Sequence, residues 1–306
     1  MLFRSASTDR VKEFAAYAGL AIGAGRGFGE PLVDAWWLAV ALVALQTSRH
    51  VSDYDFAMVQ RLRETIVPIR DVREVTDGLD RGMSTLDEAM KVSSRLNTRS
   101  WIRWMKKVIH MPIGERWLLM SVVVVAFGPR WALLVLLAAG FVALGYVAAG
   151  RLARTLSWRG STPEPALAAL IVQRDGSLLT RWLFVALPNS LTRGRFAWSL
   201  PGVLRGVELC GIALAVVVLQ PTAVVVAFWA MFVIAFHHYD TLYRSLQGCS
   251  PPSWLTRLGF GWDGRLLVVI VALCLPWWHA LFAVVVLWWV AWMGVVASVQ
   301  WLRSQK

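Results

Sequence analysis

Charged residues are scarce in this chain. Only 16% of its 306 residues are charged and 57% are hydrophobic, whereas about a quarter of the residues in a soluble globular domain carry charge. This shortage excludes an ordinary soluble domain, and the mean hydropathy of +0.55 agrees. The composition therefore predicts an integral membrane protein.

Cysteine is scarce as well. The three cysteines, Cys210, Cys249 and Cys274, are far apart in the sequence and form no Cys-x-x-Cys pair. This spacing indicates neither a disulfide framework nor a structural zinc site. We interpret the three cysteines as ordinary small residues.

Familiar catalytic motifs are missing. The chain has no P-loop, no Rossmann glycine fingerprint, no Gly-x-Ser-x-Gly elbow and no His-Glu-x-x-His zinc motif, each of which would indicate a reaction class. The acid-rich signature of CDP-alcohol phosphotransferases is also absent, because "DGLDRG" and "WDGRLL" share only fragments with it. None of these activities is indicated by a motif.

Acidic residues are outnumbered by basic ones, 19 against 31, which gives a net charge of +12. No nucleic-acid-binding motif accompanies this charge. The 18 Trp residues and the long Val, Leu and Ala runs indicate arginines that flank membrane helices instead. We therefore expect the membrane as a partner and no nucleic acid.

The chain does contain four pairs of apolar segments, each pair joined by a turn with Gly or Pro. The turns are "GRGFGEP", "FGPR", "LQPT" and "LPWW". Pairs of about forty residues predict four helical hairpins and about eight transmembrane helices. The expected fold class is all-α, a single polytopic membrane domain over residues 1–306. Residues 51–112 are expected to form a cytoplasmic or interfacial insertion with amphipathic helices, and residues 151–202 a second cytoplasmic interfacial loop.

The positions of the basic residues predict an orientation. Of the 31 Lys and Arg residues, only Arg26 and Arg130 lie in the four turns. Because basic residues are enriched on the cytoplasmic side of a membrane protein, we expect both termini and both long connections in the cytoplasm. This describes a multi-pass protein of the plasma membrane.

The first helix of each hairpin has an apolar run too short for the roughly 30 Å hydrocarbon core. To span the core, each must draw in a preceding turn that carries one acid and one base. The pairs are Lys12 with Glu13, Glu115 with Arg116, Arg205 with Glu208, and Asp263 with Arg265. A single pair is typical of an interfacial anchor, but four repeats favour a shared cytoplasmic polar layer.

Hairpins one and three end with the same His-x-x-Asp spacing, His50 with Asp53 and His237 with Asp240. Residues three apart share a helix face, and Arg244 continues the face of His237. Such a pair can share a proton or orient a histidine toward phosphate. If the two hairpins are symmetry mates, the four side chains can also hold a divalent metal such as magnesium. The simpler alternative is that each Asp only fixes its own His.

Four phrases of the sequence resemble a known family. "KKVIHMPIGERWLLMSV", "QRDGSLLTRWL", "HHYDTLYR" and "GWDGRLLVV", in that order, are similar to an uncharacterised polytopic membrane domain of actinobacteria that occurs fused to, or encoded beside, CDP-alcohol phosphatidyltransferases. The resemblance extends from about Glu13 onward and lacks the transferase part of such fusions. It implies a role in making phospholipids or phosphate-linked envelope polymers, and it assigns no catalytic residues.

Two functions remain open from the sequence. The first is a transferase of phospholipid or lipid-linked envelope glycan synthesis that binds an anionic phospholipid or polyprenyl phosphate. The second is a non-catalytic scaffold for a CDP-alcohol phosphatidyltransferase; a transporter is less favoured because the outer halves of the helices are almost purely apolar. The candidate catalytic residues are His50, Asp53, His237, Asp240, Glu115 and Glu208. The candidate phosphate-binding residues are Arg49, Arg116, Arg205, Arg244 and Arg265, and the candidate metal ligands are His50, Asp53, His237 and Asp240.

Overall fold

All secondary structure in the described part of the chain is helical. The computed structural model describes residues 2–27, 32–66, 113–158, 193–246 and 259–296, together with Asp175, Trp182, Ala186 and Val299. Eight α-helices fall within these ranges. The predicted all-α class is therefore confirmed for the part that the structure describes.

The helices pair along the chain as the turn residues predict. The first two pairs are α1 (Leu2–Gly27) with α2 (Leu32–Ile66), and α6 (Ile113–Phe127) with α7 (Pro129–Ser157). The last two are α11 (Ser199–Leu219) with α12 (Val224–Leu246), and α14 (Gly261–Cys274) with α15 (Trp278–Trp289), which continues as a π-helical segment, Val290–Val296. Each helix contacts its partner, so the four hairpins exist in three dimensions.

The turns show why the helices reverse where they do. Gly128 separates α6 from α7 with a φ of 91°, a conformation that costs glycine little, and Pro129 follows at the first position of α7. Its ring fixes a helical φ where no backbone N–H is needed. A short 3-10 helix, Pro221–Ala223, makes the reversal between α11 and α12.

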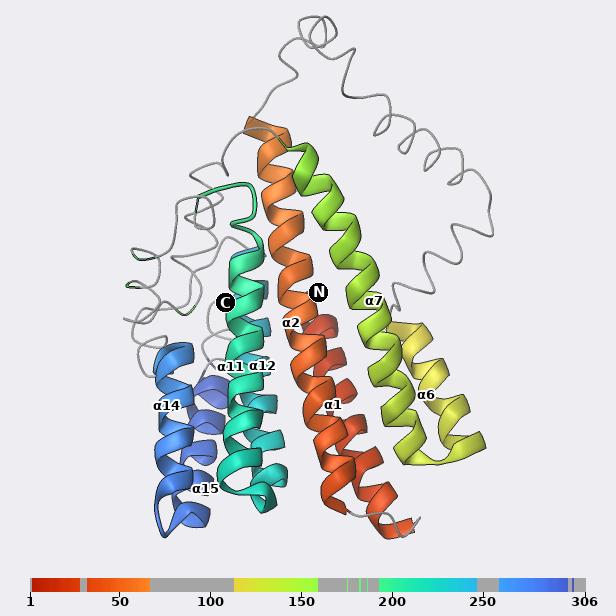
Figure 1. Cartoon of the computed structure of the whole chain (residues 1–306), viewed down its shortest axis with the longest axis vertical. Coiled ribbons are helices and arrows are strands. Elements are labelled where there is room, and N and C mark those ends of the chain that lie inside the picture. The colour runs from red at the N-terminus through yellow and green to blue at the C-terminus, as the bar shows by residue number, and fades with distance from the viewer. Residues whose placement is uncertain are drawn as a thin grey trace, which may run out of the picture.

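The four hairpins run in the same direction. In Figure 1 the helix ends that face their turns all lie at the lower end, whereas α2 and α7 extend beyond the other helices at the upper end. Helix α2 lies at the centre, in contact with α1, α7, α11 and α12. It runs on to Ile66.

Within the described residues, four helices are long and apolar enough to cross a membrane, by length and composition. They are Pro129–Leu156, Ser199–Leu219, Pro221–Arg244 and Trp278–Val295. The expected count of eight spans is therefore not supported. At about 1.5 Å per residue, the 15 residues of α6 and the 14 of α14 cover only about 21 to 23 Å, while α1 and α2 carry several charged residues along their length.

Apolar side chains divide between a buried core and an exposed belt. The core contains aromatic contacts between neighbouring hairpins, such as Phe14 with Phe232, whose ring centroids lie 5.6 Å apart, and Trp36 with Phe228 at 5.1 Å. Many large apolar side chains remain exposed on the outer helices, including Val125, Leu214 and Leu287. Exposed apolar surface of this extent is expected where helices face lipid.

Helices α2 and α11 approach closely at Gly202. A Cβ added there would lie 3.0 Å from the Cβ of Ser52 and 3.3 Å from its Cα, so the backbone of α2 would have to move. We expect Gly202→Leu to lower the thermal unfolding temperature in detergent, with a cost of about 1 to 3 kcal/mol from overpacking. Gly150→Leu is the matched control, since nothing lies within 4 Å of its added Cβ. Equal effects of the two substitutions would contradict the close α2–α11 packing.

Candidate functional site

A buried group of charged side chains joins α11, α12 and α14. We call it the Glu208 cluster, and its members are Asp175, Arg205, Glu208, His237, His238 and Arg265. All six are buried. The α11 helix contributes Arg205 and Glu208 one turn apart, and α12 contributes the two adjacent histidines. With two guanidinium groups against two carboxylates, the cluster is electrically balanced when the histidines are neutral.

Arg265 is the centre of the Glu208 cluster. Its side chain is 0% exposed, although it lies in the first turns of α14. Its Nε donates a hydrogen bond of 2.5 Å to Oε1 of Glu208, its Nη2 binds Oδ2 of Asp175, and its Nη1 donates to the carbonyl oxygen of Gly259 at 3.2 Å. Each part of the guanidinium fork therefore has an acceptor, as a buried charge requires.

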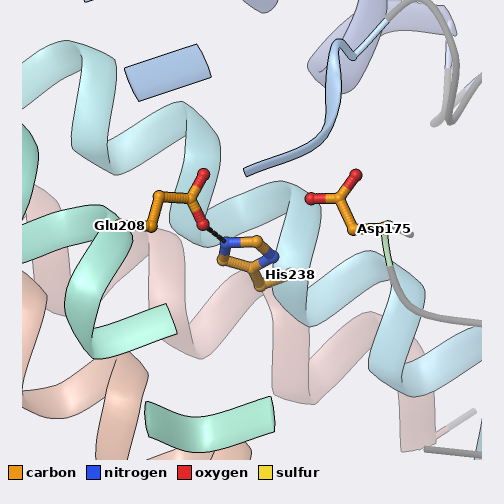
Figure 2. A group of neighbouring side chains, drawn as sticks. All are labelled: Asp175, Glu208 and His238. Carbon is orange, nitrogen blue, oxygen red and sulfur yellow. Dashed lines mark hydrogen bonds and ion pairs between the residues drawn. The ribbon is translucent and has the colours of Figure 1, made fainter. Parts of the chain in front are cut away.

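Glu208 has a partner from each neighbouring helix. Besides Arg265, its carboxylate meets Nη1 of Arg205 at 3.3 Å and Nε2 of His238 at 2.9 Å. Figure 2 shows His238 between Glu208 and Asp175, with its imidazole joined to Glu208. Since the carboxylate oxygens of Glu208 are already engaged, this geometry suits charge pairing between helices better than proton abstraction from a substrate.

His237 and Asp175 face each other without a hydrogen bond. Nε2 of His237 lies 3.7 Å from Oδ1 of Asp175, which is longer than a hydrogen bond. Both ring nitrogens of His237 and Oδ1 of Asp175 are buried and have no hydrogen-bond partner within the described residues. Unsatisfied buried polar atoms are rare in native structures and call for an explanation.

The Asp175 carboxyl has a strongly perturbed pKa. Burial alone would raise the pKa, but Arg265, His237 and Arg205 together outweigh burial and hold it well below its usual range. The folded chain therefore keeps this carboxylate ionised under conditions in which an unfolded aspartate, with a pKa of about 3.9, takes up a proton.

This pKa shift predicts a loss of stability in acid. A group whose pKa is depressed by folding stabilises the protein above its unfolded pKa and loses that contribution as the pH falls. We expect the thermal unfolding temperature to fall as the pH is lowered from about 5 to 3, each unit of pKa difference being worth about 1.4 kcal/mol. Asp175→Asn should flatten the profile in this window. Identical slopes for both proteins would contradict the ion pairing of Asp175.

A second polar group joins α1, α2 and α6. We call it the Glu13 cluster, and its members are Arg10, Glu13, Tyr17, Gln46, His50 and Arg116. Glu13 accepts hydrogen bonds from Arg10 at 2.7 Å, from the hydroxyl of Tyr17 at 2.6 Å and from Arg116. Arg116 reaches across from α6 and also donates to Gln46 at 3.1 Å. One carboxylate therefore meets two guanidinium groups in this cluster.

His50 lies at the edge of the Glu13 cluster, against α12. Its Nδ1 lies 3.3 Å from Nη2 of Arg10, and its Nε2 lies 3.5 Å from the hydroxyl of Tyr243. Because a guanidinium can only donate, Nδ1 is the acceptor and a neutral His50 carries its proton on Nε2. The His50 ring also packs on Tyr239, with centroids 5.1 Å apart. Helix α12 thus separates the two clusters, with His238 on one side and Tyr239 on the other.

The two clusters repeat one arrangement. In each, an Arg-x-x-Glu pair lies on the first helix of a hairpin, Arg10 with Glu13 on α1 and Arg205 with Glu208 on α11. In each, the first helix of the following hairpin supplies a second arginine to the same glutamate, Arg116 from α6 and Arg265 from α14. We call α1 to α7 and α11 to α15 the first and second repeat of this ion-pair pattern; their helix packing differs, since in the following hairpin α11 packs on α14 whereas α1 packs on α7.

A cleft opens beside the Glu13 cluster. Its lining comes from α1, α6 and α7, and it encloses about 230 Å³ with its open mouth included; the lining residues are Glu13, Ala16, Tyr17, Arg116, Trp117, Met120 and Leu136. Glu13, Tyr17 and Arg116 border the cleft, but nearly all of its exposed lining is apolar. The apolar side chains lie beside the exposed side of α6, where Leu118 and Val122 are more than half exposed. The cleft is therefore apolar and borders the Glu13 cluster.

The structure brings together only part of the predicted site. Arg116 lies in the Glu13 cluster with His50, while Arg205, Glu208, His237 and Arg265 lie in the Glu208 cluster. The four acid and base pairs do not meet at one point: within the described residues two separate clusters form, each from two consecutive hairpins. Glu115 is half-buried and makes no hydrogen bond to either cluster within the described residues.

The remaining predicted residues have local partners. Asp53 binds Arg151 of α7, and Asp240 binds Arg244 on its own helix at 2.8 Å. Arg49 is buried, with Asp53, Arg116, Arg151 and Arg10 as its electrostatic neighbours. It adds positive charge beside the Glu13 cluster.

The predicted metal ligands do not come together. Within the described residues, one group of three or more ligand side chains has donor atoms within 4.8 Å of one another, namely Asp175, Glu208 and His238. The set His50, Asp53, His237 and Asp240 is not such a group. The three grouped side chains do not fit a divalent cation either, because Arg205 and Arg265 already bind both carboxylates and would repel it.

Several residues of the two clusters were not predicted from the sequence. Arg10, Tyr17, His238 and Asp175 each contact a cluster carboxylate or arginine. The repeated Arg-x-x-Glu spacing at 10–13 and 205–208 was a usable signal for Arg10. Asp175 lies in the connection between hairpins two and three, and no local pattern indicates its contact with α14.

Comparison with known families gives one match. Residues 177–306 match a family described as a family of unknown function (DUF5941). The matched segment contains α11, α12, α14 and α15 and every member of the Glu208 cluster except Asp175. No curated protein and no solved structure matches the chain.

Proposed function

We propose that this membrane protein binds the phosphate headgroup of an anionic lipid at the cleft beside the Glu13 cluster. The binding would take place at the cytoplasmic leaflet of the plasma membrane, where the basic ends of the hairpins lie if the turns face outward. The role that best fits such a site is in phospholipid or lipid-linked envelope glycan synthesis, with a phospholipid or polyprenyl phosphate as the ligand.

The observation that carries this proposal is the apolar cleft that borders the Glu13 cluster. Arg116 lies at this border, and Trp117, Met120 and Leu136 line the apolar part. The enclosed part of the cleft is about the size of one water molecule, so the headgroup would lie across its open mouth rather than inside it. The acyl chain can lie along the exposed apolar face of α6.

The local charge supports an anionic ligand. Glu13 is shared by Arg10 and Arg116, and Arg49 lies within electrostatic range of both arginines. Guanidinium groups bind phosphate oxygens in pairs and with charge assistance. The net charge around an added phosphate is therefore more positive here than in the balanced Glu208 cluster.

A transferase and a scaffold differ in what they need from this site. In a transferase, His50 is the best-placed acid or base, because it lies beside the cluster between Arg10 and Tyr243. In a scaffold for a CDP-alcohol phosphatidyltransferase, the same site anchors lipid and no proton transfer is required. The exposed apolar faces of the outer helices favour the scaffold as a second candidate, since they offer surface to another membrane protein.

Native mass spectrometry of the protein released from mild detergent tests the lipid site. We expect the unchanged protein to retain a phospholipid or polyprenyl phosphate, and the Arg10→Gln, Arg116→Gln double variant to lose it while remaining folded. A protein that carries no lipid, or that retains it equally in the variant, would overturn the proposal.

A further inference from the structure

The carboxylate of Asp175 lies among three basic side chains. Its Oδ2 meets Arg265 and, at 3.3 Å, Arg205, while its Oδ1 faces His237. Its backbone has a φ of 59°, a left-handed conformation that aspartate adopts more readily than most residues other than glycine. Asp175 is 4% exposed, so this uncommon conformation coincides with a buried contact.

We propose that Arg205, Arg265 and His237 form an oxyanion pocket whose resident occupant is the carboxylate of Asp175, and that a phosphate group can take the place of this carboxylate. The pocket lies apart from the cleft of the Glu13 cluster.

The unsatisfied histidine indicates the geometry of the preferred ligand. The side chain of His237 is 2% exposed, and neither of its ring nitrogens has a hydrogen-bond partner in the part of the chain that is described. A planar carboxylate bound to two arginines leaves Nε2 of His237 at 3.7 Å. A tetrahedral phosphate has further oxygens, one of which can reach the imidazole while two others meet the guanidinium groups.

The repeat supports the same assignment. The groups that hold Asp175 correspond to Arg10, Arg116 and His50 in the first repeat, the side chains beside the proposed lipid cleft. The choice of phosphate as the ligand class therefore rests in part on the proposed function. The pocket itself rests on contacts in the second repeat alone, so it can be tested with the Glu13 cluster unchanged.

Small anions can replace the missing carboxylate in an Asp175→Gly variant. We expect sodium formate and inorganic phosphate, each at millimolar concentration against matched chloride, to raise the thermal unfolding temperature of this variant in detergent. The unchanged protein should bind phosphate at least about tenfold more weakly, because its own carboxylate competes. If neither anion stabilises the variant more than the unchanged protein, the pocket assignment is wrong.

The double variant Asp175→Gly, His237→Phe separates the two anions. Formate, which needs only the arginines, should stabilise both variants equally, whereas phosphate should stabilise the double variant less than the single one. Equal rescue by phosphate with and without His237 would overturn the part assigned to the histidine. If Asp175→Gly does not fold, Asp175→Asn retains the side-chain shape without the charge. It should bind phosphate at least about tenfold more tightly than the unchanged protein, and equal affinity would overturn the proposal.

The source of the phosphate is tested with the Asp175→Asn variant. If the pocket is reached from solution, glycerol phosphate should raise the unfolding temperature in detergent. If it is reached from the bilayer, phosphatidylglycerol nanodiscs should stabilise the variant relative to nanodiscs of phosphatidylcholine. Stabilisation in neither system would contradict the proposal. Failure here leaves the lipid cleft untouched, because that site is tested through Arg10 and Arg116.

Discussion

Arg265→Met is expected to destabilise the folded protein by about 3 to 5 kcal/mol, the range measured when one partner of a buried ion pair is removed. The guanidinium group of Arg265 is fully buried and binds both Glu208 and Asp175. Without it, two buried carboxylates share only Arg205 and the two histidines. The thermal unfolding temperature in detergent measures the loss.

Arg116→Met is the matched control for this prediction. Arg116 has the corresponding place in the first repeat, but Glu13 retains Arg10 at 2.7 Å and the Tyr17 hydroxyl at 2.6 Å. Its side chain is also 11% exposed, against 0% for Arg265. The loss of stability should therefore be clearly smaller. Equal losses would mean that the two clusters do not differ in burial and charge as described.

Arg116→Gln is expected to weaken the binding of anionic lipid by about 10-fold to 100-fold. Hydrogen bonds to charged groups contribute about 1.5 to 3 kcal/mol, and this substitution removes one charged donor from the border of the cleft. Titration of the protein with phosphatidylglycerol in detergent, followed by Trp fluorescence, gives the affinity. Trp117 lines the cleft and is placed to report on binding.

Two comparisons make the lipid prediction specific. Arg154→Gln removes an exposed arginine that donates to Gln60 on α2, and it should leave the affinity nearly unchanged. The binding of diacylglycerol, which lacks the phosphate, should depend little on Arg116. A loss of affinity that is the same for both lipids, or for both arginine substitutions, would show that Arg116 acts through folding rather than through the headgroup.

Much of the fold could be predicted because the turns carry their own signals. Gly128 and Pro129, and likewise Pro221, end one helix and begin the next through local backbone chemistry. All four hairpins run in the same direction because each hairpin returns the chain to the end of the bundle where it began. The number of membrane spans could not be predicted from such signals. Charged residues within α1 and α2 place the polar halves of these two helices in the protein interior rather than in the bilayer.

The sequence predicted several residues of the candidate site but not which of them pair with one another. Acid and base spacing on one helix, as in Arg205 and Glu208, is visible in the sequence. The arginine that joins from the next hairpin is not, because the packing of α14 on α11 decides whether Arg265 reaches Glu208. Asp175 shows the same limit, since a contact between residues 90 positions apart has no local pattern.

Photo-crosslinking with a phosphatidylglycerol analogue that carries a diazirine early in its acyl chain tests the lipid site most directly. The proposed function predicts crosslinks to α6 near Trp117 and Met120, and their loss in the Arg10→Gln, Arg116→Gln double variant. Crosslinks spread evenly over the exposed apolar faces, unchanged in that variant, would contradict a phosphate-lipid site beside the Glu13 cluster.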